Sequence, residues 1–122
     1  MSADTSRFTL YHNPRCTKSR QTLALLQEKG IEPRIVRYLE DPPDERTLKD
    51  LVGKLGLERA HDLVRHKEKE YAEAGLSPDS DDETVIRAIA RYPKLLERPV
   101  LVTGNRAALG RPPENVLPLL KD

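Results

Sequence analysis

The sequence of 122 residues has little cysteine, few aromatic residues and almost no net charge. It contains one cysteine, no tryptophan and one phenylalanine, and its 21 Lys and Arg against 20 Asp and Glu leave a net charge of +1. A single cysteine cannot form an internal disulfide, and a nearly neutral chain lacks the overall positive charge typical of proteins that bind nucleic acids. We therefore expect no disulfide framework and no nucleic-acid partner, and any anion site has to be local.

Long apolar runs are missing as well. No segment approaches the ~20 apolar residues of a membrane span, and the first residues, MSADTSR, contain no apolar core of the kind found in secretory signals. The one cysteine and three histidines form no pair at a spacing typical of zinc ligands. These absences predict a cytoplasmic protein without membrane contact, bound cofactor or metal site.

The residues that are present are sufficient for one α/β domain. Hydrophobic residues make up 37% of the chain, which is enough at this length for one mostly aliphatic core. We predict a polar tail over residues 1–7 and a single domain over residues 8–122. The charged residues, 34% of the chain, predict helices whose outer faces are strongly solvated.

The order of predicted elements is βαβ, a helical block and then ββα. Strands are expected over residues 7–12 and 33–40, with a helix between them that starts near Cys16 and ends at Gly30. Helical signals fill residues 44–92: a helix capped by Asp44, short helical pieces around residues 58–65 and 68–75, and a helix opened by a capping box of Ser80 and Glu83. Residues 100–103 and 106–109 read as a β-hairpin, and a terminal helix containing Pro118 follows.

Cys16 lies in the segment YHNPRCTKSRQTL, directly where the first helix is expected to begin. A helix N-terminus has unpaired N–H groups and a positive dipole end, which favour a thiolate and can also bind an oxyanion. His12, Arg15, Lys18 and Arg20 are nearby candidate cations. The sequence therefore predicts a nucleophilic cysteine in an anion cradle, with a buried structural cysteine as the simpler alternative.

Two known cysteine motifs do not fit this segment. A tyrosine-phosphatase loop requires an arginine six positions after the cysteine, where this chain has Thr22. A CxxC redox pair requires a second cysteine at the position of Ser19. The chain therefore has no dithiol cycle of its own.

Four segments, YHNPRCTKSRQTLALL, YLEDPP, ERPVLVT and GRPPENVL, together resemble the glutaredoxin-coupled arsenate reductases, the ArsC type. The resemblance runs from about residue 8 to residue 120. It implies a thioredoxin-like fold, with a four-stranded mixed sheet flanked by helices and a helical insertion over about residues 44–92. It also implies a cis proline at Pro99.

The resemblance further implies the site residues and the reaction. Cys16 would attack arsenate, His12 would help to keep the cysteine ionised, and the arsenate-binding arginines would be Arg65, Arg98 and Arg111. Arsenate would be reduced to arsenite for arsenic detoxification, with glutathione as co-substrate and glutaredoxin as the partner that regenerates Cys16. His61 and His66 are interpreted as solvent-exposed residues without a role.

Two other functions stay open on the sequence. The same cysteine and fold would serve a glutathione-dependent thiol oxidoreductase that acts on another substrate. A related branch of the superfamily consists of noncatalytic regulators that bind RNA polymerase, although those usually carry a CxxC switch that is absent here. Retention of all three arginines favours an oxyanion substrate.

Overall fold

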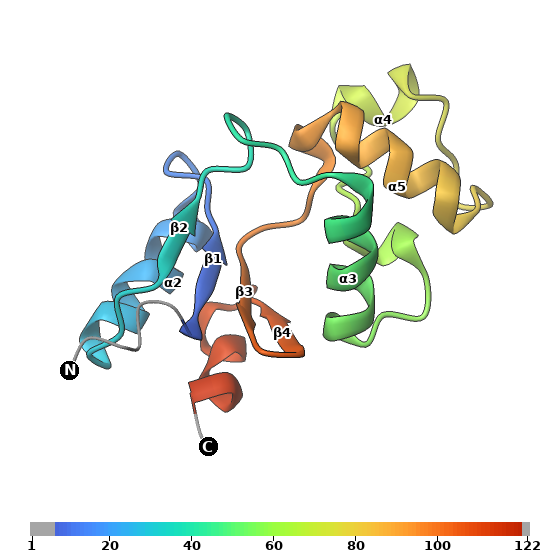
Figure 1. Ribbon diagram of the computed structural model, residues 1–122. Coiled ribbons are helices and arrows are strands. Elements are labelled where there is room, and N and C mark those ends of the chain that lie inside the picture. Colours follow the sequence, from blue (N-terminus) through green and yellow to red (C-terminus); the bar gives the residue numbers. More distant parts are fainter. Residues whose placement is uncertain (1–6, 121–122) are drawn as a thin grey trace. The chain divides into compact units, whose positions relative to one another are not determined.

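The computed structural model describes residues 7–120, so residues 1–6 of the predicted tail lie outside the described residues. The chain forms two compact units (Figure 1). Of the described residues, the first unit contains 7–41 and 98–120, and the second contains Pro42–Glu97.

The first unit contains a mixed four-stranded sheet. Its strands are β1 (Thr9–Tyr11), β2 (Arg34–Val36), β3 (Val100–Thr103) and β4 (Arg106–Leu109), in the order β2-β1-β3-β4. β1 runs parallel to β2, while the pairs β1 with β3 and β3 with β4 are antiparallel. The bounds of β3 and β4 confirm the predicted hairpin. β2 is shorter than predicted because the chain turns after Arg37, whose carbonyl accepts the N–H groups of Glu40 and Asp41.

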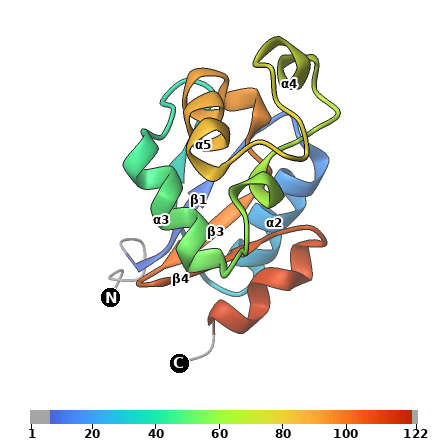
Figure 2. The ribbon, with the colours of Figure 1, turned by 90° about the vertical axis from the view of Figure 1, so that its right-hand side faces the viewer.

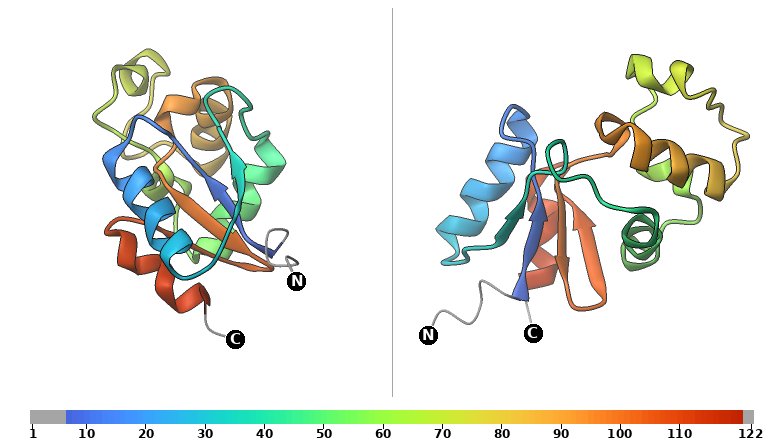
Figure 3. Two further views of the ribbon diagram at one scale, coloured as in Figure 1. Left: turned by 90° about the vertical axis from the view of Figure 1, so that its left-hand side faces the viewer. Right: turned by 45° about the horizontal axis from the view of Figure 1, so that its top comes forward.

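Two helices of the first unit, α2 (Thr17–Glu28) and the 3-10 helix η3 (Pro113–Leu120), lie side by side on one face of the sheet (Figure 3). Apolar side chains from these helices and from β1 and β3 form the core of the unit. Its buried members are Phe8, Leu10, Leu26, Ile31, Leu101, Val116 and Leu119. The terminal helix is 3-10 throughout, and Pro118 inside it has no N–H to donate to an α-helical ladder.

The second unit is made of helices, and α3 packs against α5 (Figure 2). In chain order its elements are α3 (Glu45–Leu55), η1 (Ala60–Leu63), α4 (Lys69–Glu73), α5 (Asp82–Arg91) and η2 (Pro93–Leu95). Asp44 caps α3 as predicted, since its side chain accepts the Thr47 N–H at 2.8 Å. The predicted Ser80 cap of α5 is wrong, because the N-cap is Asp81, whose carboxylate accepts the Thr84 N–H at 2.8 Å.

The short helical pieces predicted around residues 58–65 and 68–75 are present as η1 and α4. Between α3 and α5 the chain forms only short helices joined by turns, and Val64 makes an isolated antiparallel bridge with Leu96. This bridge aligns the backbone on both sides: the Arg65 N–H donates to the Leu95 carbonyl at 2.7 Å, and the Glu97 N–H donates to the Leu63 carbonyl at 2.8 Å. None of the helices within residues 7–120 is long and apolar enough to cross a membrane.

Candidate active site

Cys16 is the N-cap residue of α2. Its N–H donates to the Asn13 carbonyl at 3.0 Å, which closes a turn, and its own carbonyl accepts the Arg20 N–H at 3.0 Å as the first bond of the helix. Its side chain makes no capping hydrogen bond and is partly exposed. The sulfur therefore sits where the N–H groups of the first turn lack intrahelical acceptors and the helix dipole is positive. The position predicted from the sequence is confirmed.

A buried serine holds the loop that precedes Cys16. The Ser19 hydroxyl is 2.7 Å from Nδ1 of His12 and accepts the Asn13 N–H at 3.0 Å. Ser19 is fully buried and His12 is 6% exposed. The Asn13 side chain in turn accepts the Arg15 N–H at 3.0 Å. These bonds connect the end of β1 to the first turn of α2, so the backbone around Cys16 is fixed from both ends.

His12 is a neutral residue in this environment. Burial lowers the pKa of His12 below its usual value, and the positive charges of Arg37 and Arg20 lower it further. The ring is therefore uncharged at neutral pH and hydrogen-bonds to Ser19. Any support that His12 gives to a thiolate comes through hydrogen bonding and loop geometry, since the ring adds no positive charge.

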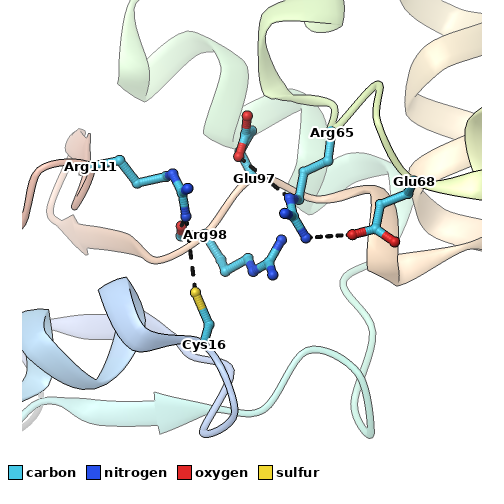
Figure 4. Close-up of polar contacts among 6 residues, drawn as sticks. All are labelled: Cys16, Arg65, Glu68, Glu97, Arg98 and Arg111. Carbon is cyan, nitrogen blue, oxygen red and sulfur yellow. Dashed lines mark hydrogen bonds and ion pairs between the residues drawn. The ribbon is translucent and has the colours of Figure 1, made fainter.

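Arg111 brings a cation to the sulfur. Its Nη1 lies 3.9 Å from the Cys16 sulfur and donates to the Arg98 carbonyl at 3.2 Å (Figure 4). The two arginines precede the two cis prolines of the chain, since the peptide bonds Arg98–Pro99 and Arg111–Pro112 are both cis. The cis form of Pro99 agrees with the sequence-based expectation, whereas that of Pro112 was not foreseen.

Gly110, directly before Arg111, allows the end of β4 to approach both Pro99 and Thr22 of α2 closely. The Gly110 N–H donates to the Pro99 carbonyl at 2.9 Å, and the Thr22 hydroxyl, on α2, donates to the carbonyls of Lys18 at 2.8 Å and Gly110 at 3.4 Å. A Cβ on Gly110 would lie 2.8 Å from Cγ of Pro99 and would also collide with Thr22. The absence of a side chain at position 110 therefore lets the end of β4 pack against α2 directly before Arg111.

Arg98 has unused hydrogen-bond donors. Its Nε and Nη1 atoms are buried and have no hydrogen-bond partner. Buried polar groups are normally paired, and an unpaired guanidinium donor is costly. These donors are available to an anionic ligand.

Arg65, the third predicted arginine, belongs to the second unit. Its Nη1 donates to Glu68 Oε2 at 2.6 Å, and its Nε lies 3.9 Å from Glu97 Oε1 (Figure 4). The side chains are about a quarter exposed. The guanidinium is thus partly neutralised by two carboxylates that the sequence reasoning did not single out, although the spacing of three residues between Arg65 and Glu68 is a known ion-pair signal.

Of the two histidines of the second unit, His66 is exposed as predicted, whereas the prediction is wrong for His61. The His61 ring is partly buried, and its Nε2 is 2.6 Å from the Tyr71 hydroxyl. The Tyr71 ring also meets His66 edge to face, with 6.4 Å between the ring centroids. These contacts connect the two ends of residues 61–71, the segment that contains Arg65.

Within the first unit, the hydrogen bonds of the Cys16 loop and of the arginine pair thus bring together Cys16, His12, Arg98 and Arg111. Sequence reasoning missed Ser19 and Gly110 as parts of this arrangement. A serine one helical turn after the cysteine was a usable signal for the first, whereas nothing in the sequence marks Gly110. Among residues 7–120, no cluster of His, Cys, Asp and Glu side chains is arranged to hold a metal ion.

Known proteins with similar sequences and structures include arsenate reductases. A protein of Neisseria meningitidis named arsenate reductase is 49% identical over 108 residues, which cover 88% of this chain and 92% of that protein. The uncharacterized protein YfgD of Escherichia coli is 49% identical over 117 residues, 95% of this chain and 98% of that protein. The solved structure of an arsenate reductase from Vibrio cholerae matches with a TM-score of 0.87 and 45% identity, over 91% of this chain and 95% of that one.

The mixed sheet, with the chain's only cysteine at the start of the helix after β1, defines a thioredoxin-like protein, as the sequence predicted. A family model, that of the ArsC family, matches residues 11–119. The chain belongs to the ArsC family.

Proposed function

We propose that this protein is an arsenate reductase in which Cys16 is the nucleophile. The observation that carries the proposal is the pairing of the chain's only thiol with the Arg111 guanidinium, 3.9 Å away, at the positive end of α2. A thiolate is the reactive form of cysteine, and cations and helix N-termini favour it. The names of the similar proteins in Neisseria meningitidis and Vibrio cholerae support arsenate as the substrate.

The arginines bind the oxyanion in this proposal. A guanidinium offers parallel N–H donors that match two oxygens of a tetrahedral anion, and the unpaired donors of Arg98 suit this task. Arg111 and the first-turn N–H groups of α2 contribute further donors next to the sulfur. For Arg65, which belongs to the second unit and is paired there with Glu68 and Glu97, a role in binding the oxyanion stays a prediction from the sequence resemblance. His12 and Ser19 act as positioning residues that hold the loop.

The reaction needs two thiols. Reduction of As(V) to As(III) takes two electrons, and oxidation of two thiols to one disulfide supplies them. The chain has one thiol, so glutathione provides the second: Cys16 attacks arsenate with loss of a water, glutathione joins the adduct, and arsenite leaves as the Cys16–glutathione disulfide forms. A glutaredoxin thiolate then removes glutathione by exchange and frees Cys16. We place this cycle in the cytoplasm, where these reductants occur.

The test is arsenate-dependent NADPH consumption in a mixture with glutathione, glutaredoxin and glutathione reductase. We expect turnover with the natural protein, none with Cys16→Ser, and a reduced kcat/KM with Arg98→Lys, which keeps the charge but loses the forked donor geometry. Turnover retained by Cys16→Ser would overturn the mechanism, and unchanged kinetics of Arg98→Lys would remove Arg98 from the site. Glutathionylation of Cys16 without arsenate turnover would instead support a thiol oxidoreductase.

A further inference from the structure

A second pair of arginines lies close to the Cys16 loop in the first unit. β1 and β2 run parallel, so their carboxyl ends lie at the same edge of the sheet, where Tyr11 pairs with Val36. The N–H of His12, the next residue after β1, donates to the Val36 carbonyl at 2.9 Å. Arg37 follows Val36 directly and is exposed. The loop leading to Cys16 and the side chain of Arg37 therefore start from adjacent positions on neighbouring strands.

Arg20 approaches the same loop from α2. Its Nη1 donates to the Pro14 carbonyl at 3.0 Å, and its Nη2 donates to the Thr17 hydroxyl at 3.3 Å. These bonds hold the guanidinium over residues 14–17 without neutralising its charge, because both acceptors are uncharged. Both Arg20 and Arg37 act on the same neighbour, since each lowers the pKa of His12 through its positive charge.

Neither cation has an acidic partner among the residues that the structure describes. Within residues 7–120, neither Arg20 nor Arg37 forms a salt bridge. The first turn of α2 contains no acidic residue. Glu40 and Asp41 follow Arg37 in the chain, but they bond to the Arg37 carbonyl through their backbone N–H groups, and no ion pair links their carboxylates to its guanidinium. Among residues 7–120, two cations without an acidic partner thus lie near the loop that carries the chain's single cysteine.

We propose that Arg37 and Arg20 form a docking site for the carboxylates of a small acidic thiol or disulfide, and that this site directs the sulfur of that molecule to Cys16. Naming glutathione as the ligand rests on the proposed function, whereas the docking site itself does not. Glutathione carries two carboxylates, and arginine is the side chain best suited to bind them with two parallel hydrogen bonds. The docking site does not use the donors of Arg98 and Arg111, which the proposed function assigns to the oxyanion.

The single cysteine allows a test without arsenate. When the Cys16 thiolate attacks glutathione disulfide, the disulfide bond breaks, a Cys16–glutathione disulfide forms and one glutathione thiolate leaves, so electrons balance without another reagent. The rate of this exchange can be followed by mass spectrometry of the intact protein. Three disulfides serve as probes: glutathione disulfide, which is anionic, 2-hydroxyethyl disulfide, which is neutral, and cystamine, which is cationic.

The decisive variant is Arg37→Glu, with Arg34→Glu as the matched control. Arg34 is also exposed, at the start of β2, and three residues of extended chain place it about 10 Å from Arg37. We expect Arg37→Glu to slow the reaction with glutathione disulfide by about tenfold, to leave the neutral probe within about twofold, and to speed the reaction with cystamine. Arg34→Glu should change each rate by less than about threefold.

Two results would overturn the docking site. Equal effects of Arg37→Glu and Arg34→Glu would mean that only net charge matters, and equal slowing of the neutral probe would mean that Arg37 changes the reactivity of Cys16 rather than the docking of its partner. A rise in the pKa of His12 in Arg37→Glu, measured by NMR, checks that the variant is folded with position 37 near the loop. Because no step of this assay uses arsenate, a failure of arsenate turnover and a failure of docking are distinguished.

Discussion

Adding one methyl group at Gly110 should destabilise the protein, because the space that this group would occupy is already filled. The new Cβ would lie 2.8 Å from Cγ of Pro99, whereas ordinary contacts begin at 3.4 Å. Relief therefore requires a shift of about 0.6 Å from the rigid proline ring and a further shift of Thr22, whose hydroxyl is held by the Lys18 and Gly110 carbonyls. Overpacking of this kind costs ~1–3 kcal/mol, and the reduced freedom of the unfolded chain offsets ~0.4–1 kcal/mol of it.

We therefore expect Gly110→Ala to lower the free energy of unfolding by about 1–2 kcal/mol, measured by urea denaturation with the m-value checked. Gly53→Ala is the matched control, since Gly53 lies inside α3 and its added Cβ would meet nothing within 4 Å. That variant should gain about 0.5–1 kcal/mol, because alanine is the better helix former. A Gly110→Ala protein as stable as the natural one, or a loss of stability of similar size in Gly53→Ala, would refute the reasoning.

Two further predictions concern the buried pair beside Cys16. Because the pKa of His12 is lowered on folding, the unfolded chain binds more protons than the folded one below about pH 6.5. The His12 contribution to stability is thus present above that pH and is lost as the pH falls toward the pKa of His12 in the folded protein. In urea denaturation, His12→Gln should therefore lose less stability on acidification than the natural protein. An equal loss in both proteins would contradict a lowered pKa of His12. Ser19→Ala removes the hydroxyl that serves both His12 and Asn13, and we expect a loss of about 1–3 kcal/mol in the free energy of unfolding, checked by the same assay; a loss below ~0.5 kcal/mol would mean that water replaces the hydroxyl.

Local signals were sufficient to predict much of the fold. The hairpin of β3 and β4, the Asp44 cap and the start of α2 at Cys16 each depend on a few neighbouring residues, and each is confirmed. The errors lie where neighbouring residues do not decide the outcome. Asp81 and Ser80 are adjacent candidates for the same cap, and β2 ends earlier than predicted because the chain turns after Arg37.

The amino-acid sequence by itself determined the chemistry of this protein: one thiol, its place at a helix N-terminus, the nearby arginines and membership of the ArsC family. Only the tertiary structure decided how these groups meet. Arg111 is 95 residues from Cys16 in the chain, and it reaches the sulfur because β4 packs against α2 at Gly110. The neutral state of His12 and the unpaired donors of Arg98 were decided in the same way, because burial and charge at a point in space depend on residues that are distant in sequence.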